Sequence, residues 1–348
     1  MPDMITLSWM AAPTARTHHR SPTLRDVARE AGVSLITASR ALGNPGLVAE
    51  ATLARVRAAV HKTGYTPNML AGGLKSRRSF TVAGLVPVVS VPQFLPTVQA
   101  LTETLDAAGY QLILGQGGYD HSREDKLVDT MISRRPDGIV VAGLLRSKAA
   151  RDKLRRSGIP VVETWDLGAR PVDMAVGFSH PEVGRALGAF FLARGWQRVG
   201  IATADDDRAM QRRGGFVAAF GRDVPTAVVP APSSLAAGRR ALAELLRKEP
   251  GLQAVCCSSD GLAQGVLAEA AARGLAVPRD LAVCGFGDAE FAAHLHPALT
   301  TVHVDGAGIG RRAAQMILAR CAGEDVPQRI ADVGFAIVER ESTRTPNP

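Results

Sequence analysis

The residues of this sequence that most clearly suggest a chemistry are the cationic side chains of its first quarter. Residues 20–78 contain ten arginines and lysines and three carboxylates, a balance of +7, whereas the whole 348-residue chain carries +8. A basic segment joined to a nearly neutral body predicts that the segment binds a polyanion such as nucleic acid. A solvated charged face is the alternative that composition alone leaves open.

Three short helices over residues 22–66 are expected to present these cations. Thr23 and Asp26 have the spacing of a capping box, and Gly32 ends a first helix that carries an apolar stripe at helical spacing. Ser34 is placed to cap the second helix, and Gly64 ends the third. Two helices joined by a tight turn that contains glycine predict a helix-turn-helix.

The second helix of such a motif enters the major groove, and its N-terminal residues meet the base edges. The side chains at these positions are Leu35, Ile36 and Thr37, followed by Ser39 and Arg40. Leu35 and Ile36 are expected to contact thymine methyl groups, because residues 38, 41 and 42 already fill the buried side. Burial of both side chains in the core is the alternative.

Polar side chains around the motif are placed to bond DNA phosphates, and such contacts set the register without reading sequence. They are Thr23, Ser34, Thr37 and Asn44. For Thr23 and Ser34, a purely structural capping role is the alternative. The full set of DNA contacts predicted for the headpiece is Thr23, Arg25, Ser34, Leu35, Ile36, Thr37, Ser39, Arg40 and Asn44.

From residue 80 the pattern changes to short apolar runs that alternate with helical stretches. Strands are expected at 81–88, 110–116, 138–143, 159–164, 174–178, 198–203, 226–230, 254–259, 281–286 and 300–304. Helices are expected at 95–108, 122–134, 147–157, 181–194, 208–220, 235–248, 261–273 and 307–322. This alternation predicts parallel sheets covered by helices, and about ten strands favour two α/β lobes. A ligand would bind at the carboxyl ends of the strands, in the cleft between the lobes.

The chain is therefore expected to fold as an all-α helix-turn-helix headpiece followed by a two-lobed α/β domain. Residues 1–21 are expected to be a disordered leader, 22–66 the headpiece, 67–79 a hinge and 80–345 the two-lobed domain. Lobe 1 would comprise about 80–177 and 304–335, and lobe 2 about 178–303 and 336–345.

Several classes of protein are disfavoured by what the sequence lacks. The four cysteines form no CxxC pair. Three of them fall in expected strands and Cys321 falls on an expected helix, so buried thiols are expected rather than a metal site. No apolar run approaches the length of a membrane span, and the first twenty residues make a poor export signal, which favours the cytoplasm. No phosphate-binding glycine loop or GxSxG motif points to an enzyme, and no cofactor is expected.

Residues 23–42, TLRDVAREAGVSLITASRAL, resemble the headpiece of the lactose-repressor family. Further matches run from about residue 22 to 340, and they include Gly64-Tyr65-Thr66-Pro67-Asn68, Ser258-Ser259-Asp260 and residues 281–286 and 297–302. Within the family, the segments 118–119, 159–163, 173–178 and 193–195 are most similar to repressors of gluconate utilisation. The resemblance implies a two-lobed domain like that of periplasmic binding proteins.

The resemblance also implies a second contact with DNA, through the hinge of a homodimer on double-stranded operator DNA. Leu74 matches the leucine that family members insert into the minor groove, and Ala71 and Lys75 lie beside it. Gly72 and Gly73 depart from the usual hinge, and glycine disfavours a free helix by about 1 kcal/mol relative to alanine. The hinge is therefore expected to be disordered when free and helical only on DNA.

The cleft positions of the family, carried over one at a time, imply an effector-binding set. It consists of Gln93, Phe94, Tyr119, Arg146, Glu163, Asp166, Phe178, Arg212, Asp260 and Asp288. Arg212 matches the arginine that commonly holds the effector, and Arg213 beside it is the alternative. Carboxylates and an arginine fork suit a sugar acid such as gluconate. Gly287 and Ser259 depart from the residues common in sugar-binding members, which are aspartate and asparagine.

A ligand that favours one arrangement of the lobes would change the affinity for DNA, and the resemblance favours induction. The alternatives are a regulator that responds to a neutral sugar or other metabolite, a regulator that binds a protein partner, and an exported solute-binding protein with the same two-lobed fold. The last would have no use for residues 22–78.

Overall fold

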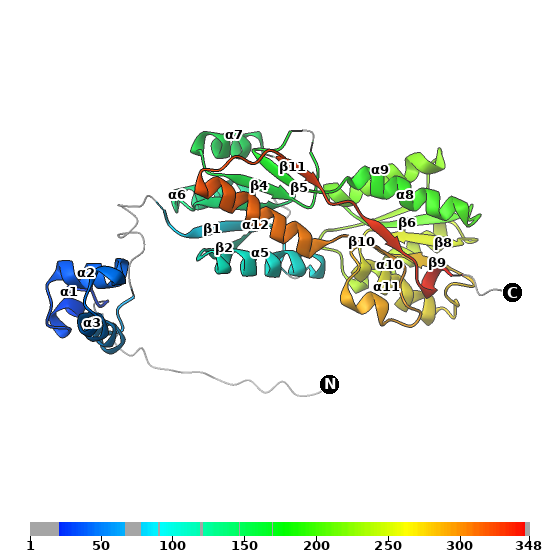
Figure 1. Cartoon of the computed structure of the whole chain (residues 1–348). Coiled ribbons are helices and arrows are strands. Elements are labelled where there is room, and N and C mark those ends of the chain that lie inside the picture. Colours follow the sequence, from blue (N-terminus) through cyan, green and yellow to red (C-terminus); the bar gives the residue numbers. More distant parts are fainter. Residues whose placement is uncertain are drawn as a thin grey trace, which may run out of the picture. The chain divides into compact units, whose positions relative to one another are not determined.

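The computed structural model describes residues 21–66, 78–89, 91–118, 121–145, 147–168 and 170–344. The chain forms two compact units, Met1–Ser79 and Phe80–Pro348, which are described separately (Figure 1). The three predicted helices of the first unit appear as α1 (Leu24–Glu30), α2 (Leu35–Gly43) and α3 (Glu50–Thr63), and a loop with a short 3-10 helix, Pro45–Leu47, joins the last two.

The core of the first unit is small and built from alanine and valine, chiefly Val27, Ala31, Ala41, Val56 and Ala59. The capping box forms as expected, since both the backbone nitrogen and the hydroxyl of Thr23 donate to the carboxylate of Asp26. Gly32 and Gly64 have φ of +62° and +65°, a conformation that glycine adopts without strain at a helix end.

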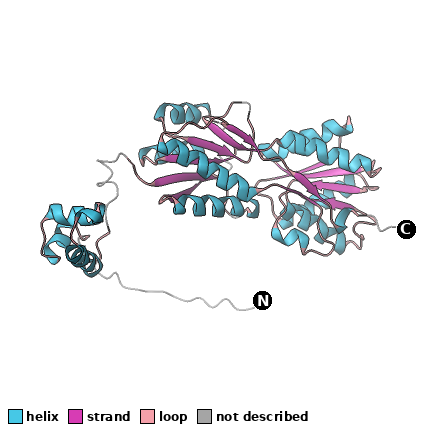
Figure 2. Ribbon diagram, in the orientation of Figure 1, coloured by secondary structure: helices cyan, strands magenta, loops and turns pink. Residues whose placement is uncertain are grey.

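The second unit contains two parallel sheets (Figure 2). The first has the order β11-β5-β4-β3-β1-β2. Its strands are β1 (Thr81–Val86), β2 (Gln111–Gln116), β3 (Gly138–Ala142), β4 (Val161–Thr164), β5 (Met174–Gly177) and β11 (Ile330–Asp332). The second has the order β7-β6-β8-β9, from β6 (Val199–Ala204), β7 (Thr226–Val229), β8 (Ala254–Cys257) and β9 (Ala282–Cys284). A third, two-stranded sheet pairs β10 (Thr301–His303) with β12 (Ala336–Val338) in antiparallel fashion.

Helices pack on the faces of each large sheet, so its interior strands are buried on both sides, whereas the edge strand β2 is largely exposed. In the first lobe, α5 (Leu95–Ala107) pairs with α12 (Gly306–Ala322), and α6 (His121–Ser133) with α7 (Lys148–Ser157). In the second lobe, α8 (His180–Ala193) pairs with α9 (Asp207–Phe220), and α10 (Leu235–Lys248) with α11 (Asp260–Ala272). Short 3-10 turns occur at Pro92–Phe94, Glu290–Ala293 and Glu341–Thr343.

Glycine allows two of these helix pairs to pack backbone against backbone. A methyl group at Gly184 of α8 would overlap the carbonyl oxygen of Arg212 in α9, and one at Gly215 of α9 would overlap the carbonyl oxygen of Pro181 in α8. Gly238 of α10 and Gly265 of α11 meet in the same way. The relative position of the helices within each pair is therefore fixed by main-chain contact.

The ten strands and eight helices expected from the sequence all have counterparts, mostly within two residues at each end. Two further strands, β11 and β12, are only three residues each, too short for an alternating pattern to reveal. Cys256, Cys257 and Cys284 are buried in strands, and Cys321 is partly buried on α12. Within the described residues, no helix is long and apolar enough to cross a membrane, and no cluster of His, Cys, Asp or Glu is placed to hold a metal ion.

Candidate functional site

The first candidate surface is the N-terminal half of α2. The hydroxyl of Ser34 accepts a 3.1 Å hydrogen bond from the backbone nitrogen of Thr37 and lies 2.8 Å from its hydroxyl, which fixes the start of the helix. Ala38 and Ala41 face the core, whereas Leu35 is 43% exposed and Ile36 is 67% exposed. The alternative that both are core residues is therefore wrong.

The other predicted headpiece contacts are also accessible, with one qualification. Arg25, Ser34, Ser39, Arg40 and Asn44 are exposed, and Thr37 is half-buried. Thr23 is half-buried, and its hydroxyl donates a 2.6 Å hydrogen bond to Asp26. The structure thus gives Thr23 the capping role that the sequence left as its alternative.

Some cationic side chains of this unit form ion pairs with carboxylates, and others have no carboxylate partner among the described residues. Arg29 forms an ion pair with Asp26, and Lys62 pairs with Glu30 at 2.6 Å. Among the described residues, no carboxylate pairs with Arg25 or Arg40. The predicted hinge contacts Ala71, Leu74 and Lys75 lie outside the part of the chain that the structure describes.

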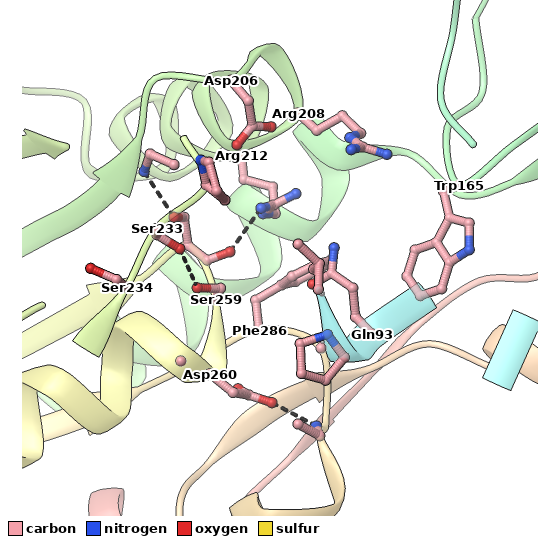
Figure 3. A pocket seen from close by; sticks show the side chains of 18 of the residues that line it. Gln93, Trp165, Asp206, Arg208, Arg212, Ser233, Ser234, Ser259, Asp260 and Phe286 are labelled. Carbon is pink, nitrogen blue, oxygen red and sulfur yellow. Dashed lines mark hydrogen bonds between the residues drawn. The ribbon is translucent and has the colours of Figure 1, made fainter. Parts of the chain in front are cut away.

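The second candidate site is a cavity of about 240 Å³ in the second unit, where the carboxyl ends of strands from both sheets meet (Figure 3). Segments that follow β1 and β4 in the first lobe, and β6, β7, β8 and β9 in the second, line it. Its polar and aromatic lining consists of Gln93, Trp165, His180, Asp206, Arg208, Arg212, Ser233, Ser234, Ser258, Ser259, Asp260, Phe286 and Phe291.

Three of the predicted effector residues, Gln93, Arg212 and Asp260, line this cavity. Asp166 lines a neighbouring, more polar cavity of about 700 Å³, which shares Asp206 and Arg208 with the first. The two cavities therefore adjoin at these two residues. Tyr119 and Arg146 lie outside the described residues.

Two predicted carboxylates are engaged elsewhere and do not line either cavity. Glu163 is fully buried, where it accepts hydrogen bonds from the backbone nitrogens of Leu145 and Val172 and pairs with Arg151 at 3.0 Å. Asp288 pairs with Arg340 at 2.7 Å and lies 2.9 Å from a ring nitrogen of His303. Both are placed as structural ion pairs rather than as ligand contacts.

Phe94 and Phe178 also differ from expectation, because both are buried in the aromatic core beside the cavity. Their rings lie 5.2 and 6.0 Å from the ring of Trp165, each in an edge-to-face arrangement. Edge-to-face packing of this kind holds an aromatic side chain in one orientation. The residue that reaches the cavity is Trp165, which the two phenylalanines position.

Arg212 is the most constrained side chain of the cavity. Its two terminal nitrogens bond the Nδ1 atom of His180 and the carbonyl oxygen of Ser258, each at 2.9 Å, and its guanidinium lies 3.8 Å from the ring centre of Phe286. Burial lowers its pKa to about 10, so the group keeps its charge at neutral pH. Its buried Nε atom has no hydrogen-bond partner among the described residues.

Arg208 lies one helical turn before Arg212 and reaches the same cleft (Figure 3). Its guanidinium is 5.1 Å from the ring centre of Phe94, and its buried Nη1 atom also lacks a partner within the described residues. Burial raises the pKa of the nearby Asp166 carboxyl, and the charge of Arg208 opposes that rise. The cleft therefore contains two arginines with donors that the described chain leaves unused.

Asp260 at the start of α11 is tied to β10 and to the segment that follows β9. Its carboxylate accepts a 2.6 Å hydrogen bond from the hydroxyl of Thr301 and a 2.7 Å bond from the backbone nitrogen of Ala289. Burial raises its pKa to about 6, although both hydrogen bonds oppose the rise. Each of its two oxygens therefore already accepts a hydrogen bond from the protein.

Three helices begin at the cavity, because the residues that cap them line it. Asp206, Ser234 and Ser259 accept hydrogen bonds from the backbone of the first turns of α9, α10 and α11. A helix N-terminus carries a partial positive charge and free N–H groups, so it favours anions. Three of them beside two arginines make an environment suited to a ligand with acceptor groups.

Sequence reasoning missed several cavity residues that general rules could have found. Arg208 precedes Arg212 by four residues and shares its helix face. Ser233 and Ser234 follow an expected strand, at the end where ligands bind. Trp165 and His180 are harder to recognise, because each reaches the cavity through a change of direction between a strand and the next element.

Comparisons with known proteins agree with this arrangement. A family model described as "Bacterial regulatory proteins, lacI family" matches residues 23–68, and a "Periplasmic binding protein-like domain" matches residues 189–343. The HTH-type transcriptional regulator GntR of Pseudomonas aeruginosa is 38% identical over 331 residues, which cover 92% of this chain and 96% of that protein. The regulator of the same name in Escherichia coli is 30% identical and covers 91% of this chain and 97% of its own.

The solved structure of a LacI family transcriptional regulator from Silicibacter pomeroyi superposes with a TM-score of 0.88 at 34% identity. The match covers 93% of this chain and all of that one. These relatives are transcriptional regulators rather than enzymes, and they match the headpiece and both lobes together. The protein is a DNA-binding transcriptional regulator that belongs to the lacI family of bacterial regulatory proteins.

Proposed function

We propose that this protein is a cytoplasmic repressor that binds operator DNA as a homodimer and releases it when a small sugar acid, such as gluconate, occupies the cavity. The observation that carries the proposal is the surplus of hydrogen-bond donors there. Arg208 and Arg212 each retain a buried nitrogen without a partner in the described chain, whereas Asp206 and Asp260 already accept hydrogen bonds from the protein.

A carboxylate satisfies such donors better than a neutral hydroxyl, because charge-assisted hydrogen bonds to arginine are about twice as strong as neutral ones. The hydroxyl groups of a sugar acid have partners on the same cavity surface, in Gln93, Ser233 and Ser259. The similarity to regulators named GntR, together with the resemblance of four segments to repressors of gluconate utilisation, supports gluconate as the first candidate.

On the DNA side, we propose that α2 reads the major groove through Leu35, Ile36 and Arg40. Ser34, Thr37, Ser39, Asn44 and Arg25 are proposed to contact the backbone or neighbouring base edges, and Ala71, Leu74 and Lys75 the minor groove. The exposure of Leu35 and Ile36 supports this assignment, since apolar side chains without a place in the core suit thymine methyl groups.

The two sites are coupled through the lobes. The cavity takes residues from both lobes, so a ligand in it favours the arrangement that brings its contacts together. If the two arrangements also differ in operator affinity, the ligand changes operator binding by some factor, and operator DNA changes ligand binding by the same factor. We propose that the favoured arrangement is the one that binds DNA weakly.

The decisive experiment measures operator affinity by fluorescence anisotropy with and without gluconate, on an operator selected from random duplexes. Operator affinity should fall by about tenfold or more with gluconate, and less with the neutral alditol sorbitol. Arg208→Gln should weaken binding of gluconate in calorimetry by about tenfold. Release by sorbitol and not by gluconate would assign the cavity to neutral sugars instead.

Arg213→Gln is the matched control, since Arg213 lies on the same helix but outside the cavity, with its Nε atom 3.3 Å from the hydroxyl of Thr226. Gluconate affinity should be unchanged in this variant. If the intact protein prefers no sequence over random duplex, with or without sugar acids, the proposed function is wrong.

A further inference from the structure

The tautomer of His180 is fixed by what its two ring nitrogens contact. Nδ1 lies 2.9 Å from a terminal nitrogen of Arg212, and Nε2 lies 2.9 Å from the carbonyl oxygen of Trp165. Arginine has donors only, so Nδ1 must accept, and a carbonyl oxygen only accepts, so Nε2 must carry the proton. The geometry therefore requires a neutral imidazole with its hydrogen on Nε2.

The surroundings of the ring keep it neutral. His180 is buried, and the charged groups that face it are Arg212 and Arg208, both on α9. Burial first, and these two guanidinium groups next, lower the pKa of His180 well below its usual value. The ring also packs edge-to-face on Phe178, with centres 4.6 Å apart. An imidazolium in this position would direct an N–H toward a guanidinium.

We propose that His180 is a positioning residue for the effector: its neutral ring holds the guanidinium of Arg212 in the orientation that receives the effector's carboxylate. The inference rests on the proposed function. Arg212 is fixed by His180, by the carbonyl oxygen of Ser258 and by the ring of Phe286. With one hydrogen on each terminal nitrogen used, the second hydrogen on each and the Nε hydrogen remain for a ligand.

His180 also joins the two lobes at this point. It is the first residue of α8 in the second lobe, while Trp165 follows β4 in the first. The hydroxyl of Thr97 accepts a 2.9 Å hydrogen bond from the indole nitrogen of Trp165, so the residue whose carbonyl oxygen accepts the hydrogen bond from His180 is itself held by the first lobe. Through His180, the orientation of the Arg212 guanidinium thus depends on the position of the Trp165 carbonyl group in the first lobe.

The test compares the affinities for gluconate and for its neutral amide, gluconamide, by calorimetry on the full-length chain. In His180→Phe, which keeps an aromatic ring but removes the acceptor, the preference for gluconate should fall about tenfold, because the charge-assisted contact is the one that depends on the arginine's orientation. In His180→Gln, whose carbonyl can accept from Arg212 and whose amide can donate to Trp165, the preference should return to within about threefold of wild type.

His294→Phe makes the same change at an exposed histidine and should leave the preference unaltered. A residue with a purely structural role would weaken both ligands equally. An unchanged ratio of the two affinities in His180→Phe, with wild type binding gluconate, would overturn the role of His180 and leave the proposed function standing.

If wild type binds neither ligand, the proposed function fails, and nitrogen-15 NMR of the free protein still decides the role of the histidine. A protonated Nε2 and an accepting Nδ1, with a changed Nδ1 chemical shift in Arg212→Leu, would support it. An imidazolium, or the reversed tautomer, would overturn it.

Discussion

The hydroxyl of Thr301, the first residue of β10, donates a 2.6 Å hydrogen bond to the carboxylate of Asp260, which lines the cavity at the start of α11. This contact does not fully offset the loss of water around a buried charge, and burial raises the pKa of Asp260 to about 6 from 3.8. A raised folded-state pKa means that the neutral form is favoured in the folded protein.

Stability should therefore respond to pH at this site. The contribution of Asp260 is fully present below its unfolded pKa and is lost as the pH rises through about 6. Between pH of about 5 and about 7.5, the free energy of unfolding of wild type should fall by about 1 kcal/mol relative to Asp260→Asn. Urea unfolding of both proteins at the two pH values checks this, and a parallel response of the two proteins would contradict it.

Removal of an exposed apolar side chain on α2 should reduce operator binding without reducing stability. Ile36 is 67% exposed, so Ile36→Ala should change the free energy of unfolding by less than about 0.5 kcal/mol. Loss of contacts to thymine methyl groups should weaken the selected operator by roughly 1 kcal/mol more than random duplex. Anisotropy titrations measure both affinities.

Ile330→Ala is the matched control, because Ile330 is 43% exposed and belongs to β11 in the other unit. Its operator affinity should equal that of wild type. Equal losses of operator affinity in Ile36→Ala and Ile330→Ala would contradict the proposal that α2 contacts the bases.

The two adjacent glycines of α9 should respond in opposite directions to the same substitution. Nothing lies within 4 Å of a Cβ atom at Gly214, so Gly214→Ala should stabilise the protein by about 0.5–1 kcal/mol through helix propensity. At Gly215 the new methyl group would overlap the carbonyl oxygen of Pro181, and Gly215→Ala should destabilise by roughly 2 kcal/mol or more. Thermal unfolding of the two variants tests this prediction. A change of melting temperature of the same sign in both would contradict the close packing at Gly215.

Thiol accessibility should separate Cys321 from the other cysteines. Burial raises the pKa of Cys256 to about 12, and it raises those of Cys257 and Cys284 as well. Because the thiolate is the reactive form, these three should not react with an aromatic disulfide reagent in the folded protein. Partly buried Cys321 should react slowly, and all four should react in denaturant; rapid reaction of a second thiol in the native protein would contradict this.

The sequence was sufficient to predict the strand and helix alternation, because the strands are short apolar runs and helical stretches separate most of them. It also identified Arg212, Asp260 and Gln93. It misplaced Glu163 and Asp288, whose partners Arg151 and Arg340 lie 12 and 52 positions away. A carboxylate at the end of a strand looks the same in the sequence whether it faces a ligand or an internal arginine.

The close contact of α8 with α9 has a consequence for how an effector acts on the molecule. With Gly184 and Gly215 bringing backbone against backbone, neither helix can slide along the other, so His180, Arg208 and Arg212 travel as one rigid body. A ligand that displaces either arginine therefore acts on the whole helix pair, which residues 178–179 join to β5 of the first lobe. The response of this pair is a movement of two helices together rather than a local shift of side chains.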